Sequence, residues 1–259
     1  MAYLDRFEFQ NKKKGFNGTI LVIGGSKMYT GAPYFSALAS FQTGSDMVYI
    51  FSDSDSINPL KVLLPEAIVM DYSYEEWILK RVNVCIFGPG LGRPNHSQLC
   101  VIKSILYFLA RRNIKIIVDG DGIRIASELN IFNFKNLIFT PNANEMVAVP
   151  ELKEEQYLIR KGEKDVVESI NKEIVVEEPA CQKRIGGQGD ILNGILATLL
   201  SKIKGESTEE DIILCLKLSS IVLRRAGNKA FSQKGISLLT RDILEEIPKV
   251  FFEVLTENE

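Results

Sequence analysis

The sequence contains a single histidine, His96, and four cysteines among its 259 residues. One histidine leaves little room for a Ser-His-Asp triad or a metal site built from histidines. The cysteines, at positions 85, 100, 181 and 215, include no Cys-x-x-Cys pair and have neither disulfide nor zinc-site spacing. We therefore expect the chemistry of this chain to depend on carboxylates, lysines and backbone amides.

Long apolar runs and an excess of one charge are also missing. No run approaches the roughly 18 apolar residues of a membrane-spanning helix, and the N-terminal stretch has no hydrophobic signal segment. Lys and Arg number 31 against 33 Asp and Glu, so no overall field favours nucleic acid or a membrane surface. These absences predict a cytoplasmic protein that binds neither nucleic acid nor membrane.

Short apolar runs alternate with helical patterns over the first half of the chain. Strands are expected at residues 19–24, 47–51, 67–70, 82–87, 115–118 and 136–139, and helices at residues 32–42, 58–64, 96–111 and 123–129. This order predicts an α/β fold in which a mainly parallel central sheet has helices on both faces. In such sheets, ligands bind at the carboxyl ends of the strands.

The last third of the chain has a different pattern. Three closely spaced strands are expected at residues 156–160, 165–170 and 173–177, followed by helices at residues 189–203, 208–231 and 241–255. No internal repeat, low-complexity tract or linker separates these segments from the rest. We therefore expect residues 1–259 to form one domain.

The most informative motif, Arg184-Ile-Gly-Gly-Gln-Gly-Asp190, leads into an apolar helix. Glycines before a helix let backbone N–H groups approach an anion, which the helix dipole also attracts. Asp190 stands where it would repel that anion. Two explanations are equally open. Asp190 is either a general base that takes a hydroxyl proton while a phosphoryl group arrives, or a helix cap.

Glycine-rich or acidic loops follow several of the other predicted strands. Gly24-Gly25-Ser26 and Gly88–Gly92 permit close approach of the backbone to a ligand. Asn142–Glu145 supplies a carboxylate that can hold water around magnesium, although a solvated turn is its simplest interpretation. Asp119 and Asp121 either help a metal or hydrogen-bond the site, or cap the helix that follows them, and capping is the favoured interpretation.

Three further residues receive simpler interpretations. The Lys161-Gly162 turn is expected to offer its backbone to a nucleotide, while the lysine side chain faces solvent. Cys181 and His96 are expected to be structural or incidental.

Together these loops resemble the ribokinase-like superfamily and, within it, the NAD(P)H-hydrate dehydratases that repair hydrated nicotinamide cofactors. The resemblance spans residues 15–231 and is most specific at residues 21–33, 88–93, 118–122, 140–142 and 186–190. The run Gly25-Ser-x-x-Tyr-x-Gly-Ala-Pro33 distinguishes this family from sugar and vitamin kinases of the same fold. With Gly-Gly-Gln-Gly-Asp190, it is most similar to the eukaryotic, ATP-using branch.

The resemblance implies a three-layer α/β/α fold and a reaction coupled to nucleotide hydrolysis. A nucleotide, ATP or ADP, phosphorylates the hydroxyl group of (6S)-NADHX or (6S)-NADPHX, the hydrated forms of NADH and NADPH. Loss of phosphate then restores the nicotinamide ring. The small-molecule partners are thus the hydrated cofactor and the nucleotide. A homo-oligomer is compatible with the resemblance.

The resemblance also implies roles for individual residues. Asp190 is the base and contacts substrate, and Glu145 is associated with Mg2+ through water. The remaining assignments are the phosphate-binding amides at Gly186, Gly187, Gln188 and Gly189; nucleotide contacts at Lys161, Gly162, Glu163, Lys164, Asp165, Ala180, Cys181, Gln182, Lys183, Arg184 and Ile185; and substrate contacts at Ala32, Gly90, Asn142, Ala143, Asn144, Glu145, Met146, Val147 and Ala148.

The chain departs from the family at two places. Ala143 stands where relatives often have histidine, and only ten residues separate Glu145 from the strand expected at Gln156, where relatives carry further helices. Two alternatives therefore stand beside the dehydratase. One is a kinase of the same fold that acts on a hydroxymethylpyrimidine or a thiazole alcohol, and the other is a non-catalytic nucleotide-binding scaffold.

Overall fold

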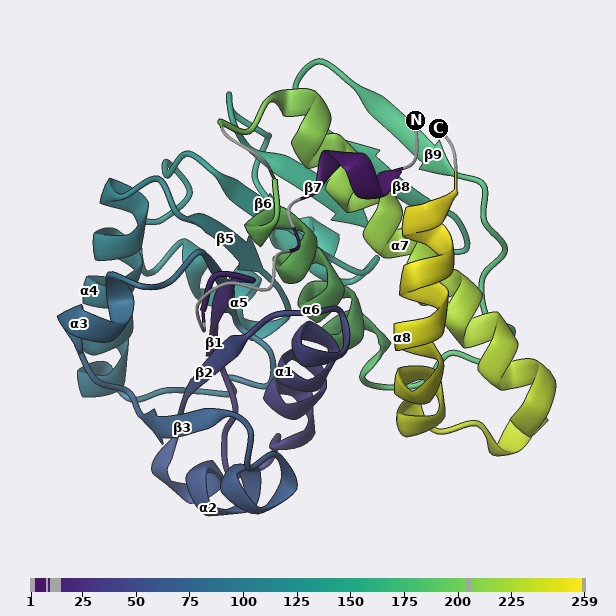
Figure 1. Ribbon diagram of the computed structural model, residues 1–259. Coiled ribbons are helices and arrows are strands. Elements are labelled where there is room, and N and C mark those ends of the chain that lie inside the picture. The colour runs from purple at the N-terminus through teal and green to yellow at the C-terminus, as the bar shows by residue number, and fades with distance from the viewer. Residues whose placement is uncertain (1–2, 8, 10–14, 204–205, 258–259) are drawn as a thin grey trace.

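The computed structural model describes residues 3–7, 9, 15–203 and 206–257. Its centre is one nine-stranded sheet with the order β3-β2-β1-β4-β5-β6-β7-β8-β9 (Figure 1). Strands β1 to β7 run parallel, and β8 and β9 are antiparallel additions at one edge. The strands are β1 Thr19–Ile23, β2 Met47–Ser52, β3 Ile68–Asp71, β4 Val84–Phe87, β5 Lys115–Val118, β6 Leu137–Phe139, β7 Tyr157–Arg160, β8 Asp165–Glu168 and β9 Glu173–Val176.

Helices cover both faces of this sheet, as the sequence predicts. One face carries α1 Gly31–Gln42, α2 Ser54–Leu63, α6 Gln188–Ser201, α7 Glu209–Lys234 and α8 Thr240–Thr256, and the other carries α3 Glu76–Leu79, α4 His96–Arg111 and α5 Asp121–Ala126 (Figure 1). Short 3-10 turns complete the fold at η1 Tyr3–Arg6, η2 Glu145–Ala148 and η3 Gly235–Ser237. None of the helices described is long and apolar enough to span a membrane.

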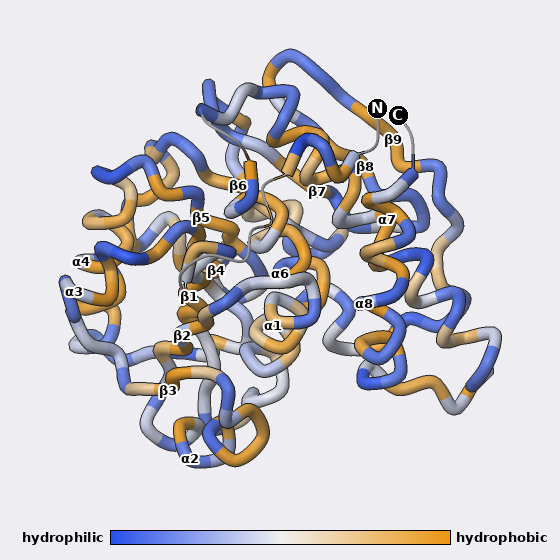
Figure 2. Tube along the Cα trace, viewed as in Figure 1, coloured by the Kyte–Doolittle hydropathy of each residue, from blue (hydrophilic) through white to orange (hydrophobic). Residues whose placement is uncertain are grey.

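The central strands are apolar apart from their first residues, such as Thr19 and Lys115, because both of their faces are buried. In β1, Ile20 and Val22 pack beneath α1 and α6, whereas Leu21 and Ile23 belong to the core beneath α4. Successive side chains of a strand point to opposite faces, so a run without polar residues is what a doubly covered parallel strand requires. Figure 2 shows these apolar segments at the centre of the molecule.

The structure shifts some predicted boundaries. Helix α2 begins at Ser54, not at residue 58, because the Asp53 carboxylate accepts a hydrogen bond from the Asp55 N–H and caps an earlier start. The four-residue helix α3 was not expected, since a single turn has too little periodicity to detect. Helix α4, by contrast, covers the predicted residues 96–111.

Two glycines bring the loops at the carboxyl ends of neighbouring strands into backbone contact. A Cβ atom on Gly24, after β1, would lie 2.2 Å from the carbonyl oxygen of Pro89. Gly88, after β4, has a φ of 117°, and a Cβ atom there would lie 1.9 Å from the carbonyl oxygen of Asp119. Only glycine is compatible with these approaches. The loops after β1, β4 and β5 therefore form one continuous floor.

Candidate active site

A large cavity of about 1660 Å³ opens at the carboxyl ends of the parallel strands. Its walls are the loops that follow β1, β4, β5, β6 and β7, together with the residues that lead into α6. The glycine and acidic motifs far apart in the sequence thus meet at one edge of the sheet. This is where an open α/β sheet binds its ligands.

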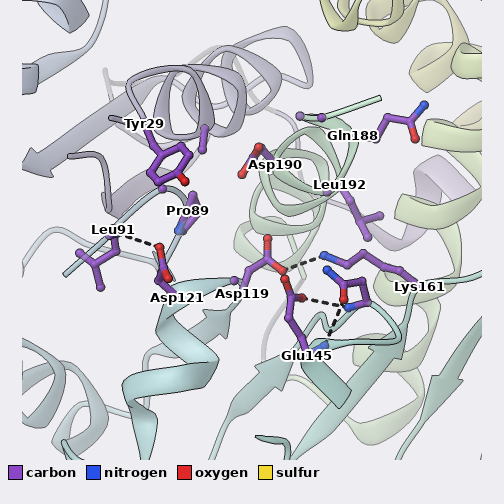
Figure 3. Close-up of a pocket in the computed structure, with 18 of the residues that line it drawn as sticks. Tyr29, Pro89, Leu91, Asp119, Asp121, Glu145, Lys161, Gln188, Asp190 and Leu192 are labelled. Atoms are coloured by element: carbon purple, nitrogen blue, oxygen red, sulfur yellow. Dashed lines mark hydrogen bonds and ion pairs between the residues drawn. The ribbon is translucent and has the colours of Figure 1, made fainter. Parts of the chain in front are cut away.

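Asp190 projects into this cavity from the first turn of α6 (Figure 3). The helix is preceded by Gly187 in the left-handed conformation, with a φ of 96°, and no side chain caps it. The simple capping interpretation of Asp190 is therefore wrong. The half-buried carboxylate faces the loops after β5 and β6, which carry Asp119 and Glu145.

The surroundings of Asp190 raise the pKa of its carboxyl group to about 7. Burial is the largest cause, because it penalises the charged form. The negative charges of Asp119 and Glu145 raise the pKa further, and the Lys161 ammonium opposes them. A carboxylate with a pKa near neutrality is well matched to general-base catalysis.

Beneath Asp190 lies a buried chain of polar side chains. The Lys161 ammonium contacts Asp119 Oδ1 at 2.8 Å, and Asn193 Nδ2 donates to Asp119 Oδ2 at 2.7 Å. Thr140 Oγ1 in turn donates to Asn193 Oδ1 at 3.0 Å. This chain joins the ends of β5, β6 and β7 to α6, so it fixes the loops of the cavity relative to the helix that carries Asp190.

Two expectations from the sequence are corrected here. Asp119 does not cap α5, since the capping position is Gly120 and no side chain bonds the helix start; its carboxylate is used by Lys161 and Asn193. The Lys161 side chain does not face solvent, because it is only 20% exposed and its charge is drawn to Asp119. Asp121 accepts from the Gly92 N–H at 2.8 Å and so ties the loop after β4 to α5.

Two of the three glycines of the anion motif, Gly187 and Gly189, are closely surrounded. A Cβ atom on Gly189 would lie 2.9 Å from the Lys161 ammonium nitrogen. A Cβ atom on Gly187 would lie 2.6 Å from the Thr240 side chain, and the Thr240 hydroxyl donates to the Gly186 carbonyl. The loop thus combines backbone amides, a helix start and a buried cation, which are the elements of a phosphate site.

The loop after β6 is held by its own side chains. Glu145 Oε2 accepts from the Asn142 N–H at 2.9 Å, and Asn142 Oδ1 accepts from the backbone of Asn144 and Glu145. Ala143 lies in the same cavity wall and adds no polar side chain. On the opposite side, Gly90 approaches Tyr29 and Ala32 closely.

Most of the predicted site residues line this cavity. These are Ala32, Gly90, Asn142, Ala143, Glu145, Lys161, Gly162, Glu163, Asp165, Ala180, Cys181, Arg184, Ile185, Gly186, Gly187, Gln188, Gly189 and Asp190. Cys181 thus lines the cavity and also packs against the hydrophobic core. His96, by contrast, begins α4 and contacts Cys100.

Other predicted contact residues lie outside the cavity. Among the substrate contacts they are Asn144, Met146, Val147 and Ala148, and among the nucleotide contacts they are Lys164, Gln182 and Lys183. Met146 packs onto the core and Val147 is 91% exposed, because successive side chains of the 3-10 turn η2 point in different directions. The Lys183 ammonium donates to the Ile236 and Leu238 carbonyls at 2.6 and 2.8 Å, so it anchors the anion loop from behind.

Several site residues were missed in the sequence. Asn193 lies one turn after Asp190 and is fully buried. A polar residue within this otherwise apolar stretch is the sequence signal that could have revealed the buried chain of polar side chains. Asp53, Tyr72, Arg124 and Arg224 line the cavity from segments without a recognisable motif. No sequence signal identifies them, since only the fold brings them to the site.

Comparison with known proteins places these features in a family. A family model described as NAD(P)H-hydrate dehydratase matches residues 20–249. An ATP-dependent (S)-NAD(P)H-hydrate dehydratase from Entamoeba histolytica is 33% identical over 271 residues, which cover 95% of this chain and 90% of that protein. The enzyme of the same name from Homo sapiens is 28% identical, covering 93% and 79% of the two chains.

Solved structures share the fold. A ribokinase-like superfamily protein from Enterococcus faecalis superposes with a TM-score of 0.81 at 20% identity, covering 97% of this chain and 93% of that chain. An ADP/ATP-dependent NAD(P)H-hydrate dehydratase from Bacillus subtilis, co-crystallised with ATP and Mg2+, gives a TM-score of 0.74 at 15% identity and covers 97% and 96%. The nine-stranded sheet is therefore of the ribokinase-like type.

Proposed function

The chain belongs to the NAD(P)H-hydrate dehydratase family, and on this premise we propose that Asp190 is its catalytic base. The function is the ATP-dependent dehydration of (6S)-NADHX and (6S)-NADPHX to NADH and NADPH, with release of ADP and phosphate. Enzymes with this activity are the relatives that match over most of the chain, which favours a dehydratase over a small-molecule kinase.

The observation that carries the proposal is the position of Asp190 beside a glycine anion loop. Its carboxylate takes the proton of the substrate hydroxyl group while the terminal phosphoryl group of ATP moves to that oxygen. Phosphorylation turns a poor leaving group into a good one. The carbon–oxygen bond then breaks, phosphate departs with the former hydroxyl oxygen, and loss of a ring proton restores the double bond.

The anion loop supports the transferring phosphoryl group. The N–H groups around Gly187–Gly189 and the start of α6 favour the negative charge that develops there. Lys161 lies directly below Gly189 and adds a positive charge that Asp119 holds in place. A substrate hydroxyl group at Asp190 would therefore lie next to a phosphoryl group bound at the anion loop.

A magnesium ion is compatible with the residues present. Mg2+ usually keeps several waters and takes few protein carboxylates, and the described residues contain no cluster of three or more His, Cys, Asp or Glu side chains suited to a metal. Glu145 lies in the cavity wall with one carboxylate oxygen bonded to the Asn142 N–H. Glu145 would hold the ion through water, and the ion would neutralise phosphate charge on ATP.

The two ligands occupy different parts of the cavity in this proposal. The turn at residues 161–165 and the segment 180–185 bind the nucleotide. The start of α1 with Ala32 and the loops with Gly90 and Asn142 bind the hydrated cofactor. In this proposal the chain acts as one domain in the cytoplasm. Sedimentation velocity of the purified protein would detect a homo-oligomer.

The test is recovery of absorbance at 340 nm, where the reduced nicotinamide absorbs, from purified (6S)-NADHX with Mg2+ and either ATP or ADP. We expect recovery with ATP, and an Asp190→Ala variant that still binds ATP but loses activity. A stable phosphorylated product without recovery would instead indicate the kinase. ATP binding without any turnover would indicate the scaffold.

A further inference from the structure

Arg224 in α7 is a buried guanidinium that no part of the reaction uses directly. The residue is 5% exposed, and it forms a two-point ion pair with Asp165, with Nε at 2.9 Å from Oδ2 and one terminal nitrogen at 2.8 Å from Oδ1. The same guanidinium donates to three carbonyl oxygens, those of Gly162 at 3.1 Å, Glu163 at 2.8 Å and Glu178 at 3.0 Å. All of its donor groups are therefore directed at backbone or at Asp165.

These acceptors come from two separate segments of the cavity wall. Gly162 and Glu163 belong to the turn between β7 and β8, and Asp165 is the first residue of β8, while Glu178 lies between β9 and the anion motif. Asp165 Oδ1 also accepts from the Gly162 N–H at 3.0 Å, so it closes the turn on itself. One buried side chain thus joins the turn after β7 to the segment that leads into the anion loop.

The same face of α7 makes two further contacts with that segment. Asn228, one turn after Arg224, donates to the Pro179 carbonyl at 2.6 Å. Gly227 lies against Cys181, since a Cβ atom on Gly227 would be 3.0 Å from the Cβ atom of Cys181. Residues three and four positions apart share a helix face, so α7 holds residues 178–181 along a full turn.

Orienting these carbonyls also orients the peptide planes that contain them. A trans peptide directs its C=O and N–H groups in opposite directions. The Gly162 and Glu163 carbonyls face Arg224, so the N–H groups of Glu163 and Lys164 face away from it. The conformation of the turn is therefore fixed by the guanidinium and not only by the strands on either side.

We propose that Arg224 is a positioning residue for ATP: it holds the turn at residues 161–165 and the segment at residues 178–181 at the separation that the nucleotide requires. The proposal rests on the proposed function for the identity of the nucleotide. It also assigns Asp165 to Arg224, as the carboxylate that neutralises a buried cation, whereas the sequence suggested a direct contact of Asp165 with nucleotide.

Arginine is suited to this role in a way that lysine is not. Its planar fork presents five N–H donors in fixed directions, whereas lysine offers a compact charge on a flexible stem. An Arg224→Lys variant keeps the charge next to Asp165 but cannot reach three carbonyls as well. We expect the KM for ATP to rise by roughly tenfold or more, as for loss of a hydrogen bond to a charged group.

A positioning role and general damage to the fold are distinguished by which kinetic constants change. In Arg224→Lys the KM for ATP should rise, while the KM for NADHX stays unchanged and kcat falls by less than about threefold. Calorimetric titration with ATP and Mg2+, without NADHX, should show the same loss of affinity. The milder Asn228→Ala variant, which keeps the ion pair, should change ATP affinity in the same direction.

Arg112, an exposed arginine that also bonds backbone carbonyls, provides the control. It also donates to two carbonyls, those of Leu79 at 2.7 Å and Lys80 at 2.9 Å, on the α3 and α4 side of the molecule away from the cavity. Arg112→Lys should leave ATP affinity unchanged.

The outcomes separate the inference from the proposed function. Arg224→Lys and Asn228→Ala variants that bind ATP as the wild type does would overturn the positioning role. If Arg224→Lys fails to fold, Asn228→Ala alone decides the result. A wild-type protein that binds ATP but never converts NADHX would contradict the dehydratase, while the binding measurements would still test Arg224.

Discussion

At the residue scale, Asp190 is a carboxylate placed where a helix start and a glycine loop attract anions. Burial and the charges of Asp119 and Glu145 make its negative charge costly, and Lys161 limits that cost. The proton affinity of this carboxylate is therefore set first by burial and then adjusted by three charged neighbours. Removing one of these neighbours should shift the pH at which activity appears, while the reaction itself stays the same.

The pKa near 7 predicts a rising pH profile. The base acts only when ionised, so at pH values below its raised pKa an increasing fraction of Asp190 is protonated and inactive. We expect kcat/KM for NADHX to fall by about tenfold for each pH unit well below 7 and to level off above it. Initial rates between pH 6 and pH 9 check this, and a flat profile over that range would contradict the assignment of Asp190.

Removing Lys161 should change both stability and this profile. Lys161→Met leaves Asp119 charged and buried without its cation, which typically costs 3–5 kcal/mol. Because Lys161 lowers the pKa of Asp190, its loss should also move the midpoint of the profile to higher pH. Urea unfolding at pH 7.5 measures the stability, and rate measurements give the midpoint.

Lys164 serves as the control for this experiment. It pairs with Glu177 at 2.6 Å, but the two side chains are 58% and 72% exposed, so Lys164→Met should cost at most about 1 kcal/mol. A double variant, Lys161→Met with Asp119→Asn, should recover part of the stability lost in Lys161→Met. Equal stabilities for the two single lysine variants would show that the buried pair has no special role.

At the element scale, the site depends on loops that touch through their backbones. Strand β4 ends at Phe87, and at Gly88 the chain must turn against the carbonyl of Asp119. That contact fixes the loop after β5, which presents Asp119 to Lys161 and Asn193. A change at the strand end should therefore reach the active site although Gly88 carries no functional side chain.

Gly88→Ala tests this connection. The added methyl group would lie 1.9 Å from the Asp119 carbonyl at a φ of 117°, and we expect a loss of roughly 3 kcal/mol or more in unfolding free energy. A reduced kcat/KM should accompany it. Gly235→Ala is the control, since Gly235 also has a positive φ of 55° but nothing within 4 Å of the added atom; it should lose stability only moderately and keep its activity.

Much at this scale was predictable from sequence. Apolar runs indicated the strands, because burial on both faces requires continuous apolar sequence. Helical spacing indicated α1, α4 and the helix after Asp190, because burial on one face imposes a period on the sequence. The capping of α5 was predicted wrongly, since a local pattern cannot show that Asp119 has a stronger partner 42 residues away in Lys161. The side-chain direction of Lys161 was wrong for the same reason.

At the scale of the whole molecule, α7 and α8 support the anion loop from outside the sheet. Arg224 and Asn228 hold the segment before the loop, and Lys183 and Thr240 tie the loop itself to η3 and α8. None of these contacts has a local sequence signature. They could be predicted only by knowing that α7 packs beside β8 and that α8 packs against α7.

A nucleotide that binds these joined elements should stabilise the entire fold. At a free ATP concentration one hundred times its Kd, linkage contributes about 2.7 kcal/mol, or a rise in Tm of roughly 5–10 °C for a chain of this size. Thermal unfolding with Mg2+ and with or without ATP measures the shift. An Asp190→Asn variant should keep most of it, because the base is not needed for binding; an unchanged Tm in the wild type would argue against a nucleotide site.

The most direct measurement follows NADH and phosphate together in one reaction of (6S)-NADHX with ATP and Mg2+. The account predicts one phosphate released for each NADH formed, and loss of both signals in Asp190→Asn by roughly two to four orders of magnitude, the usual contribution of a general base. NADH recovery without phosphate release, or full activity in Asp190→Asn, would contradict a reaction that proceeds through phosphorylation at Asp190.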